Sequence, residues 1–121
     1  MTTKQKFSFT PVSKAVVMIK GSADKLGWAL DQVRGKSLPE AMNFLFFHNL
    51  ACCKPVAKLI KSASANALNL QTASDLKDLW ISEIYAVKSM ELRRFKAGPR
   101  GRARPIRKRY SRVFVELGVK K

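Results

Sequence analysis

Residues 93–112 read RRFKAGPRGRARPIRKRYSR, and this stretch decides how the rest of the chain is interpreted. It contains ten of the 24 basic residues of the chain, eight of them arginine, and no acidic residue. Its centre, residues 98–101, is Gly-Pro-Arg-Gly, a composition typical of a tight turn. Strand-forming residues precede it at 80–87 and follow it at 113–117. The pattern predicts an arginine-rich loop held between two strands that pair as a long antiparallel hairpin.

The charge of the chain is concentrated at its C-terminal end. The 121 residues are 46% hydrophobic, enough to build the core of one domain, and the formal net charge is +16. Residues 90–121 hold twelve basic and two acidic residues. Because such a segment repels itself, we expect it to become ordered mainly when a polyanion binds. Arginine presents a planar fork of donors that binds phosphate and stacks on bases, so the predicted partner is a nucleic acid.

The first half of the chain predicts one strand and three helices. A β-branched run at 15–19 predicts a short strand. Helical spacing of apolar residues predicts helices at about 23–34 and from Ser37 to about His48, and Pro55 opens a third. Ser22 is a candidate N-cap, and Ser37 with Glu40 forms a capping box. The stripe of the second helix is Leu38, Ala41, Met42 and Leu45, widened by Phe44 and Phe47.

The third helix has an apolar face and a basic face. The apolar face is Val56, Leu59, Ile60, Ala63 and Ala67. Lys54, Lys58 and Lys61 lie on the other side at spacings of four and three. A lysine stripe is usually a face exposed to solvent. In a chain with a net charge of +16, these lysines are equally compatible with contact to phosphate groups.

The later strand segments predict which side chains face the core. In the segment 80–87, strict alternation places Trp80, Ile84 and Ala86 on one face and Ile81, Tyr85 and Val87 on the other. We expect a globular body at about 14–89 and 110–118 and an extended hairpin at about 88–110. With arms of ~18 residues at about 3.3 Å each, the hairpin would reach ~60 Å.

The sequence offers no catalytic, cofactor or metal-binding constellation. His48, Cys52 and Cys53 lack the four ligands and spacing of a zinc site, and the thiols are expected to be free in a reducing compartment. Asp75 and Asp78 are more typical of a turn than of an acid–base pair. No stretch approaches the roughly 18 apolar residues of a membrane span, and residues 1–6 lack the apolar core of a secretory signal, so we expect a mature chain.

Three patches resemble the L-twenty-two family of large-subunit ribosomal proteins, over roughly Val16 to Val115. Residues 33–36, Val-Arg-Gly-Lys, resemble the end of the first helix of that family. Residues 62–69, Ser-Ala-Ser-Ala-Asn-Ala-Leu-Asn, resemble its Ser-Ala-x-Ala-Asn-Ala-x-x-Asn signature. The basic stretch resembles its hairpin, although residues 96–100 depart from the usual Pro-Arg-Ala tip and Arg112 stands where the family has His.

The resemblance implies an α+β fold, a three-stranded antiparallel sheet packed against three helices with a long basic β-hairpin. It implies a structural constituent of the large ribosomal subunit that binds ribosomal RNA and supports assembly. The hairpin would line the peptide exit tunnel, which adds neighbouring ribosomal proteins and the nascent peptide as partners. The segments 22–25, 31–35 and 51–55 resemble plastid and cyanobacterial members, which favours a chloroplast ribosome over a bacterial cytoplasm or another organelle.

The expected RNA-binding residues combine the basic stretch, the lysine stripe and the family-like patches. They are Lys25, Arg34, Lys36, Lys54, Lys58, Lys61, Asn66, Arg93, Arg94, Lys96, Arg100, Arg102, Arg104, Arg107, Lys108, Arg109 and Arg112. Phe95 and Tyr110 lie among the arginines and are candidates for stacking on unpaired bases, with packing against the opposite strand an equal alternative for Tyr110.

Two other functions fit parts of the sequence less well. Residues 99–105 resemble an Arg-Gly-Arg hook for the DNA minor groove, but the motif occurs once, is interrupted by Ala103-Arg104 and is flanked by strands. A cationic membrane binder requires a basic amphipathic helix, whereas this basic stretch contains two prolines and two glycines. We expect neither a membrane nor a small-molecule substrate as partner.

Overall fold

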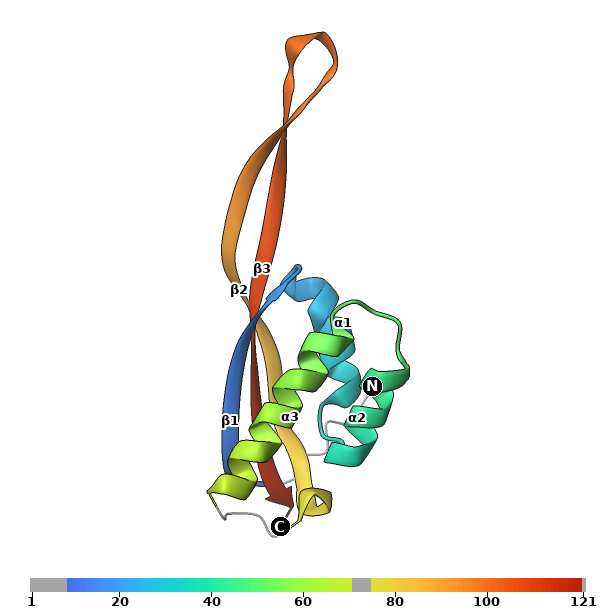
Figure 1. Ribbon diagram of the computed structural model, residues 1–121, viewed down its shortest axis with the longest axis vertical. Helices are drawn as coiled ribbons and strands as arrows, with labels where there is room; N and C mark the ends of the chain where they lie inside the picture. Colours follow the sequence, from blue (N-terminus) through green and yellow to red (C-terminus); the bar gives the residue numbers. More distant parts are fainter. Residues whose placement is uncertain (1–8, 71–74, 121) are drawn as a thin grey trace, which may run out of the picture.

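The computed structural model describes residues 9–70 and 75–120, which form a three-stranded sheet, three α-helices and two short 3-10 turns (Figure 1). The elements follow the order β1 (Phe9–Lys20), α1 (Ala23–Val33), α2 (Leu38–Phe47), α3 (Cys53–Asn69), β2 (Leu79–Ala97) and β3 (Ala103–Lys120). One 3-10 turn, Leu76–Asp78, precedes β2, and the other, Pro99–Gly101, joins β2 to β3.

The sheet is antiparallel with the strand order β1-β3-β2, so the last strand of the chain is the central one. β1 pairs with β3 from Phe9 opposite Lys120 to Lys20 opposite Tyr110. β2 pairs with the other edge of β3 along its whole length. The α+β class with three strands and three helices is confirmed. β1 is longer than the strand predicted at 15–19 because its pairing with β3 continues past the apolar run to residue 9.

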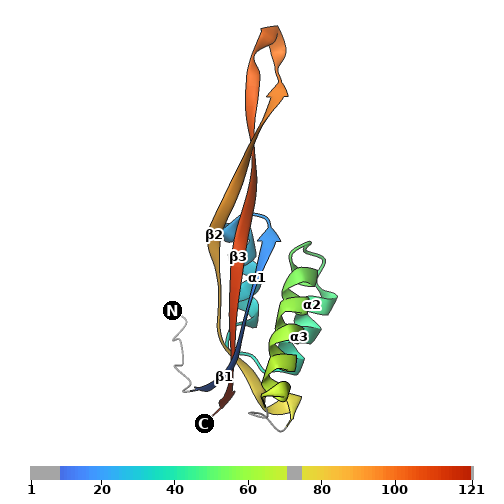
Figure 2. The same cartoon turned by 60° about the vertical axis from the view of Figure 1, so that its left-hand side comes forward.

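The helices cover one face of the sheet, where they enclose the core (Figure 2). α3 packs on β1 and β3, α1 packs on β2, and α2 packs on α3. The predicted apolar face of the third helix is confirmed, since all five of its residues are at most 4% exposed. The helix begins at Cys53 rather than at Pro55, which lies in its first turn.

A β-bulge corrects the predicted faces of β2. The register with β3 shifts between Ile81 and Glu83, so strict alternation is broken there. As a result Ile81 and Ile84 are both buried, at 0% and 1% exposure. The prediction that Ile81 shares the outer face with Tyr85 and Val87 was wrong. The outer face of the sheet carries Tyr85 and Val87, each 46% exposed.

Backbone contacts replace the predicted capping box. Ser22 and Ser37 occupy the N-cap positions of α1 and α2, but neither makes a side-chain cap hydrogen bond. Instead, the backbone around Ser37 forms a bridge to Trp80. Next to it, the Gly35 N–H donates to the Ile81 carbonyl and the Ile81 N–H donates to the Lys36 carbonyl, both at 3.0 Å. The connection between the first two helices is therefore fixed to the edge of β2.

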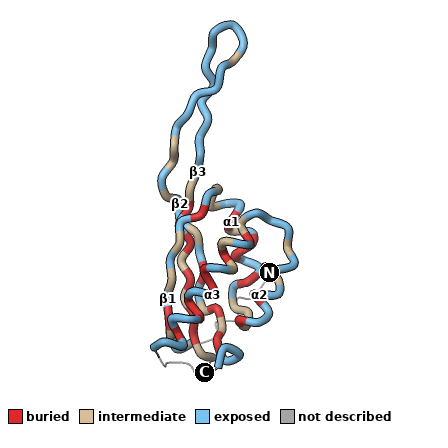
Figure 3. Tube along the Cα trace, viewed as in Figure 1, coloured by how far each residue is buried: buried red, intermediate tan, exposed pale blue. Residues whose placement is uncertain are grey.

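β2 and β3 remain paired beyond the end of β1 and form a projecting hairpin (Figures 1 and 3). The pairing continues from Lys88 opposite Ser111 to Ala97 opposite Ala103. All side chains from 93 to 97 and from 99 to 109 are exposed. About ten residues per arm at about 3.3 Å each give a reach of ~30 Å. This is half of the predicted length, because the first part of each strand belongs to the body sheet.

We expect the hairpin and the body to differ in amide exchange in the RNA-free protein. Isolated two-stranded ribbons are marginally stable in water, and among residues 9–70 and 75–120 no third strand pairs with the arms beyond Lys20. Amides at 93–107 should exchange almost as fast as those of an unstructured peptide, while those of α3 and the centre of β3 should be strongly protected. Hydrogen-exchange mass spectrometry measures both, and equal protection of hairpin and body would contradict this expectation.

Candidate nucleic-acid interface

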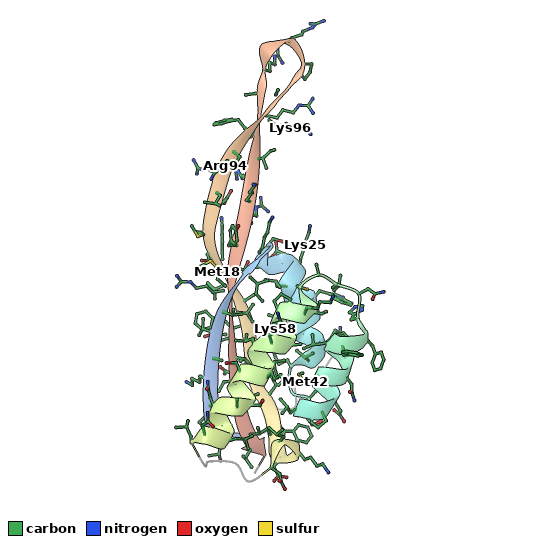
Figure 4. All side chains as sticks on the ribbon, in the orientation of Figure 1. Met18, Lys25, Met42, Lys58, Arg94 and Lys96 are labelled. Carbon is green, nitrogen blue, oxygen red and sulfur yellow. The ribbon has the colours of Figure 1, made fainter. Side chains whose placement is uncertain are left out.

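The hairpin brings like charges face to face. Arg93 lies opposite Arg107, and Lys96 lies opposite Arg104. Like charges at directly opposed positions destabilise an antiparallel pair, and within the described part of the chain no third strand pairs with the hairpin at these positions to offset this cost. All ten basic residues of the stretch are exposed, including Arg94 and Lys96, which Figure 4 labels on the hairpin. The two strands of the hairpin therefore carry a high density of positive charge.

The tip of the hairpin is the tight turn that the sequence predicts. The Gly98 N–H donates to the Arg102 carbonyl at 2.6 Å, and the Arg102 N–H donates to the Pro99 carbonyl at 3.3 Å. Gly101 has a φ of 69°, and Arg100 has a φ of 58°. A left-handed conformation costs a non-glycine residue about 1–2 kcal/mol. A side chain at Gly98 would begin 2.8 Å from the Arg102 carbonyl oxygen, so the turn closes only with glycine there.

Glu91 marks the inner limit of the acid-free surface. Its carboxylate lies 3.3 Å from Arg107 Nε and 3.6 Å from Lys88 Nζ. It sits next to a register shift in β2, between Lys88 and Glu91. The chain has no acidic residue from 92 to 115. Arg107 is thus the member of the basic stretch that is partly neutralised within the protein, and the others are available to a ligand.

An exposed ring lies among the arginines. Phe95 is 78% exposed and pairs with Pro105 across the hairpin. The two segments 93–95 and 105–107 enclose a hollow of about 230 Å³. Ile106, 38% exposed, forms part of it, and the sequence analysis did not select this residue. Its place opposite Arg94 depends on the hairpin register, which the sequence did not fix. Tyr110 is half-buried at the base of the hairpin.

The lysine stripe of α3 lies on the outside of the body. Lys54, Lys58 and Lys61 are exposed, and the first two line a groove of about 330 Å³ beside the edge of β1. Figure 4 labels Lys58 on α3 and Lys25 near the base of the hairpin. Lys25 and Asn66 are also exposed. The body thus adds exposed cations, but at a much lower density than the hairpin.

Arg34 and Lys36 are engaged by the protein itself. Arg34 Nε and Nη2 donate to the Ile84 carbonyl at 3.1 and 2.8 Å, and its Nη1 pairs with Asp31. The guanidinium therefore joins α1 to β2, which gives Arg34 a structural role in the protein. Lys36 Nζ lies 5.3 Å from the centroid of the Phe44 ring, a distance typical of a cation–π contact.

Replacing Arg34 by Ala should lower the free energy of unfolding by about 1–3 kcal/mol, because the Ile84 carbonyl loses two charge-assisted donors. The affinity for RNA should change little. Urea denaturation and an RNA-binding titration check the two parts, and Gln32→Ala, at an exposed position on the same helix, is the matched control. If Arg34→Ala lowered the affinity for RNA without changing the free energy of unfolding, Arg34 would be an RNA-contacting residue.

The two thiols are free, with Cys52 partly buried and Cys53 buried at the start of α3. In residues 9–70 and 75–120, no group of three or more His, Cys, Asp and Glu side chains is arranged to hold a metal ion. Burial, and then the neighbouring Cys52, raise the pKa of the Cys53 thiol, which therefore stays protonated at neutral pH. Across the same two ranges, none of the helices has the length and apolar character that crossing a membrane requires.

Comparison with known protein families shows which family the chain belongs to. The model of the family described as ribosomal protein L22p/L17e matches residues 15–118. The chain belongs to this family. Its membership makes it a structural ribosomal protein and not an enzyme. The resemblance inferred from the three sequence patches is confirmed.

Individual L22p/L17e relatives match over most of their length. The protein named large ribosomal subunit protein uL22 in Neorickettsia sennetsu is 40% identical over 101 residues, covering 84% of this chain and 88% of that protein. The uL22 protein of a Synechococcus strain is 40% identical over 109 residues, covering 89% and 87%. That of a Dehalococcoides mccartyi strain is 44% identical over 103 residues, covering 84% and 94%.

Proposed function

We propose that this L22p/L17e chain is a constituent of the large ribosomal subunit that binds large-subunit ribosomal RNA, chiefly through its hairpin. The opposed arginines and lysines carry this proposal, since a hairpin that repels itself is stabilised when phosphates neutralise it. Contacts of this kind recognise the shape and the backbone of folded RNA and need little base reading. The hollow beside Phe95 would accept an unpaired base, with arginines on either side to bind its phosphates.

The residues proposed to contact RNA are the expected set without Arg34, which is held by the Ile84 carbonyl, and without Lys54 and Lys58, which line an apolar groove. Lys25, Lys36, Asn66 and Lys61 would bind phosphates near the body, and the arginines and lysines from 93 to 112 would enter the RNA more deeply. By the family resemblance, the hairpin would line the peptide exit tunnel and meet the nascent peptide, and the chain would support subunit assembly beside neighbouring ribosomal proteins. A plastid stroma is the proposed compartment, supported by the Synechococcus relatives.

A minor-groove hook is disfavoured by the shape of the tip. Such a hook lies flat and extended along the groove, whereas residues 98–102 form a closed turn with two backbone hydrogen bonds. The exposed arginines would still bind duplex DNA weakly through charge alone.

Sedimentation through a sucrose gradient after a high-salt wash tests the proposed function. The epitope-tagged chain should remain with the large subunit, and a photoreactive phenylalanine at Phe95 should cross-link to large-subunit ribosomal RNA. Loss of the chain from the subunit at high salt, or its migration with chromosomal DNA, would overturn the proposal. Separate fractionation of plastids and cytosol tests the compartment.

A further inference from the structure

Two phenylalanines at the end of α2 expose most of their apolar surface to solvent. Phe46 is 83% exposed and Phe47 is 78% exposed, and their ring centroids lie 5.4 Å apart in an edge-to-face arrangement. We call this pair the aromatic ridge. The sequence predicted that Phe47 would widen the buried stripe of α2, and this prediction was wrong. Both rings lie in the last turn of α2, whose buried residues are Leu38, Ala41 and Leu45.

A groove adjoins the aromatic ridge. It has a volume of about 660 Å³ and lies between the end of α2, the connection at 48–51 and the first turns of α3. Its apolar wall includes Met42, Leu45, Leu50 and Ala57, and Phe46 borders it. Figure 4 labels one residue from each helix, Met42 on α2 and Lys58 on α3. A contiguous apolar surface of this kind, rimmed by polar groups, is typical of an interaction site.

The charge of the groove indicates what it binds. Lys54 and Lys58 are exposed and line it, and none of the described residues that line it is acidic. The lysines lie one helical turn apart on α3, so their charges act on the same stretch of a ligand. An occupant with apolar side chains in the groove and carboxylates beside the two lysines satisfies both features.

The composition of the groove favours protein over RNA as the occupant. Most of its apolar lining is aliphatic or thioether side chains, which adapt to other side chains. His48 also lines the groove, but its ring packs against Trp28 and Phe44. The edge-to-face geometry of the aromatic ridge likewise forms no parallel slot. Its cations are lysines alone, whereas the hairpin presents arginines around an exposed ring with a hollow beside it. Exposed aromatic residues beside an apolar pocket are typical centres of protein interfaces.

We propose that the aromatic ridge and its groove dock an apolar segment with adjacent Asp or Glu residues from a neighbouring protein of the large subunit. This rests on the proposed place of the chain in that subunit, but it does not require the hairpin to bind RNA. The apolar side chains enter the groove against Met42 and Leu45, and the carboxylates pair with Lys54 and Lys58. Charge complementarity fixes the register of the segment.

Photo-cross-linking from the ridge tests the proposal. The tagged full-length chain, with benzoylphenylalanine in place of Phe46, is expressed in the source cells, and purified large subunits are irradiated. The expected product is a peptide of another large-subunit protein that has apolar residues within a few positions of Asp or Glu. Adding Lys54→Glu and Lys58→Glu should lower the yield per incorporated chain by about tenfold, because like charges would then face each other. Adding Lys77→Glu, at an exposed position away from the groove, should leave it unchanged.

Several results would overturn the docking proposal. They are a cross-link to RNA, a cross-link only within the chain, no cross-link, or a peptide without acidic residues. The same probe at Phe95 gives the separate readout for the hairpin, so failure of RNA binding and failure of docking are distinguishable. In the free protein, Phe46→Ser with Phe47→Ser should leave the melting temperature unchanged, whereas Phe44→Ser, at a partly buried ring packed on the core, should lower it. A large loss of stability in the double variant would make the ridge part of the fold.

Discussion

Replacing Arg100, Arg102 and Arg104 together by Ala should weaken binding to large-subunit ribosomal RNA by about tenfold to a hundredfold at physiological salt. Each lost phosphate contact removes released counterions, so the slope of log K against log salt should become shallower by about 2 to 3. The melting temperature should not fall, because all three side chains are exposed at the tip. Filter binding at several salt concentrations measures the first two quantities.

The matched variant carries lysine at the same three positions. It keeps the charge but loses the planar fork, so its salt slope should stay near that of the wild type while its affinity falls by a smaller factor. If the Ala and Lys variants have the same slope, the tip does not contact phosphate. A fall in melting temperature would instead make these arginines structural.

Replacing Val56 by Asp should unfold most of the protein. Val56 is completely buried on the face of α3 that packs against the sheet. An unpaired carboxylate there costs about 3–5 kcal/mol, a large part of the about 5–15 kcal/mol that stabilises a typical domain. Circular dichroism during urea denaturation should show a much lower midpoint or no folded baseline.

Ala65→Asp provides the comparison for Val56→Asp. Position 65 is exposed on the same helix, so the new carboxylate remains hydrated and the loss should be below about 1 kcal/mol. Equal destabilisation at the two positions would mean that the helix tolerates no aspartate, and the burial argument would fail. A stable Val56→Asp variant would contradict the orientation of α3.

Local patterns in the sequence predicted the elements well, and long-range geometry explains where they failed. The five apolar residues of the third helix could be read from helical spacing because a helix fixes its own faces. The face of Ile81 could not, since the bulge at 81–83 exists only in the register with β3. The capping box failed for a similar reason: the backbone around Ser37 is held by the edge of β2, and no side-chain cap forms.

In the candidate site too, local composition predicted some features, and long-range geometry determined the others. Composition alone predicted that the arginines of the hairpin are exposed. A run of basic residues without acidic partners cannot be buried, because burying unpaired charges is too costly. Arg34 was assigned to RNA from its family-like patch, but a carbonyl 50 residues away binds its guanidinium, and nothing near it in the sequence indicates that contact. The hollow between Phe95 and Ile106 and the groove beside Phe46 depend on tertiary packing in the same way.

The strand order β1-β3-β2 also has a consequence for biosynthesis. Neither edge strand has its partner until the C-terminal strand emerges from the ribosome that makes it, because both pair only with β3. Until β3 is available, β1 and β2 therefore have unpaired edges, and unpaired strand edges are prone to aggregation. A chain that ends before Ala103 lacks the central strand and cannot form this sheet.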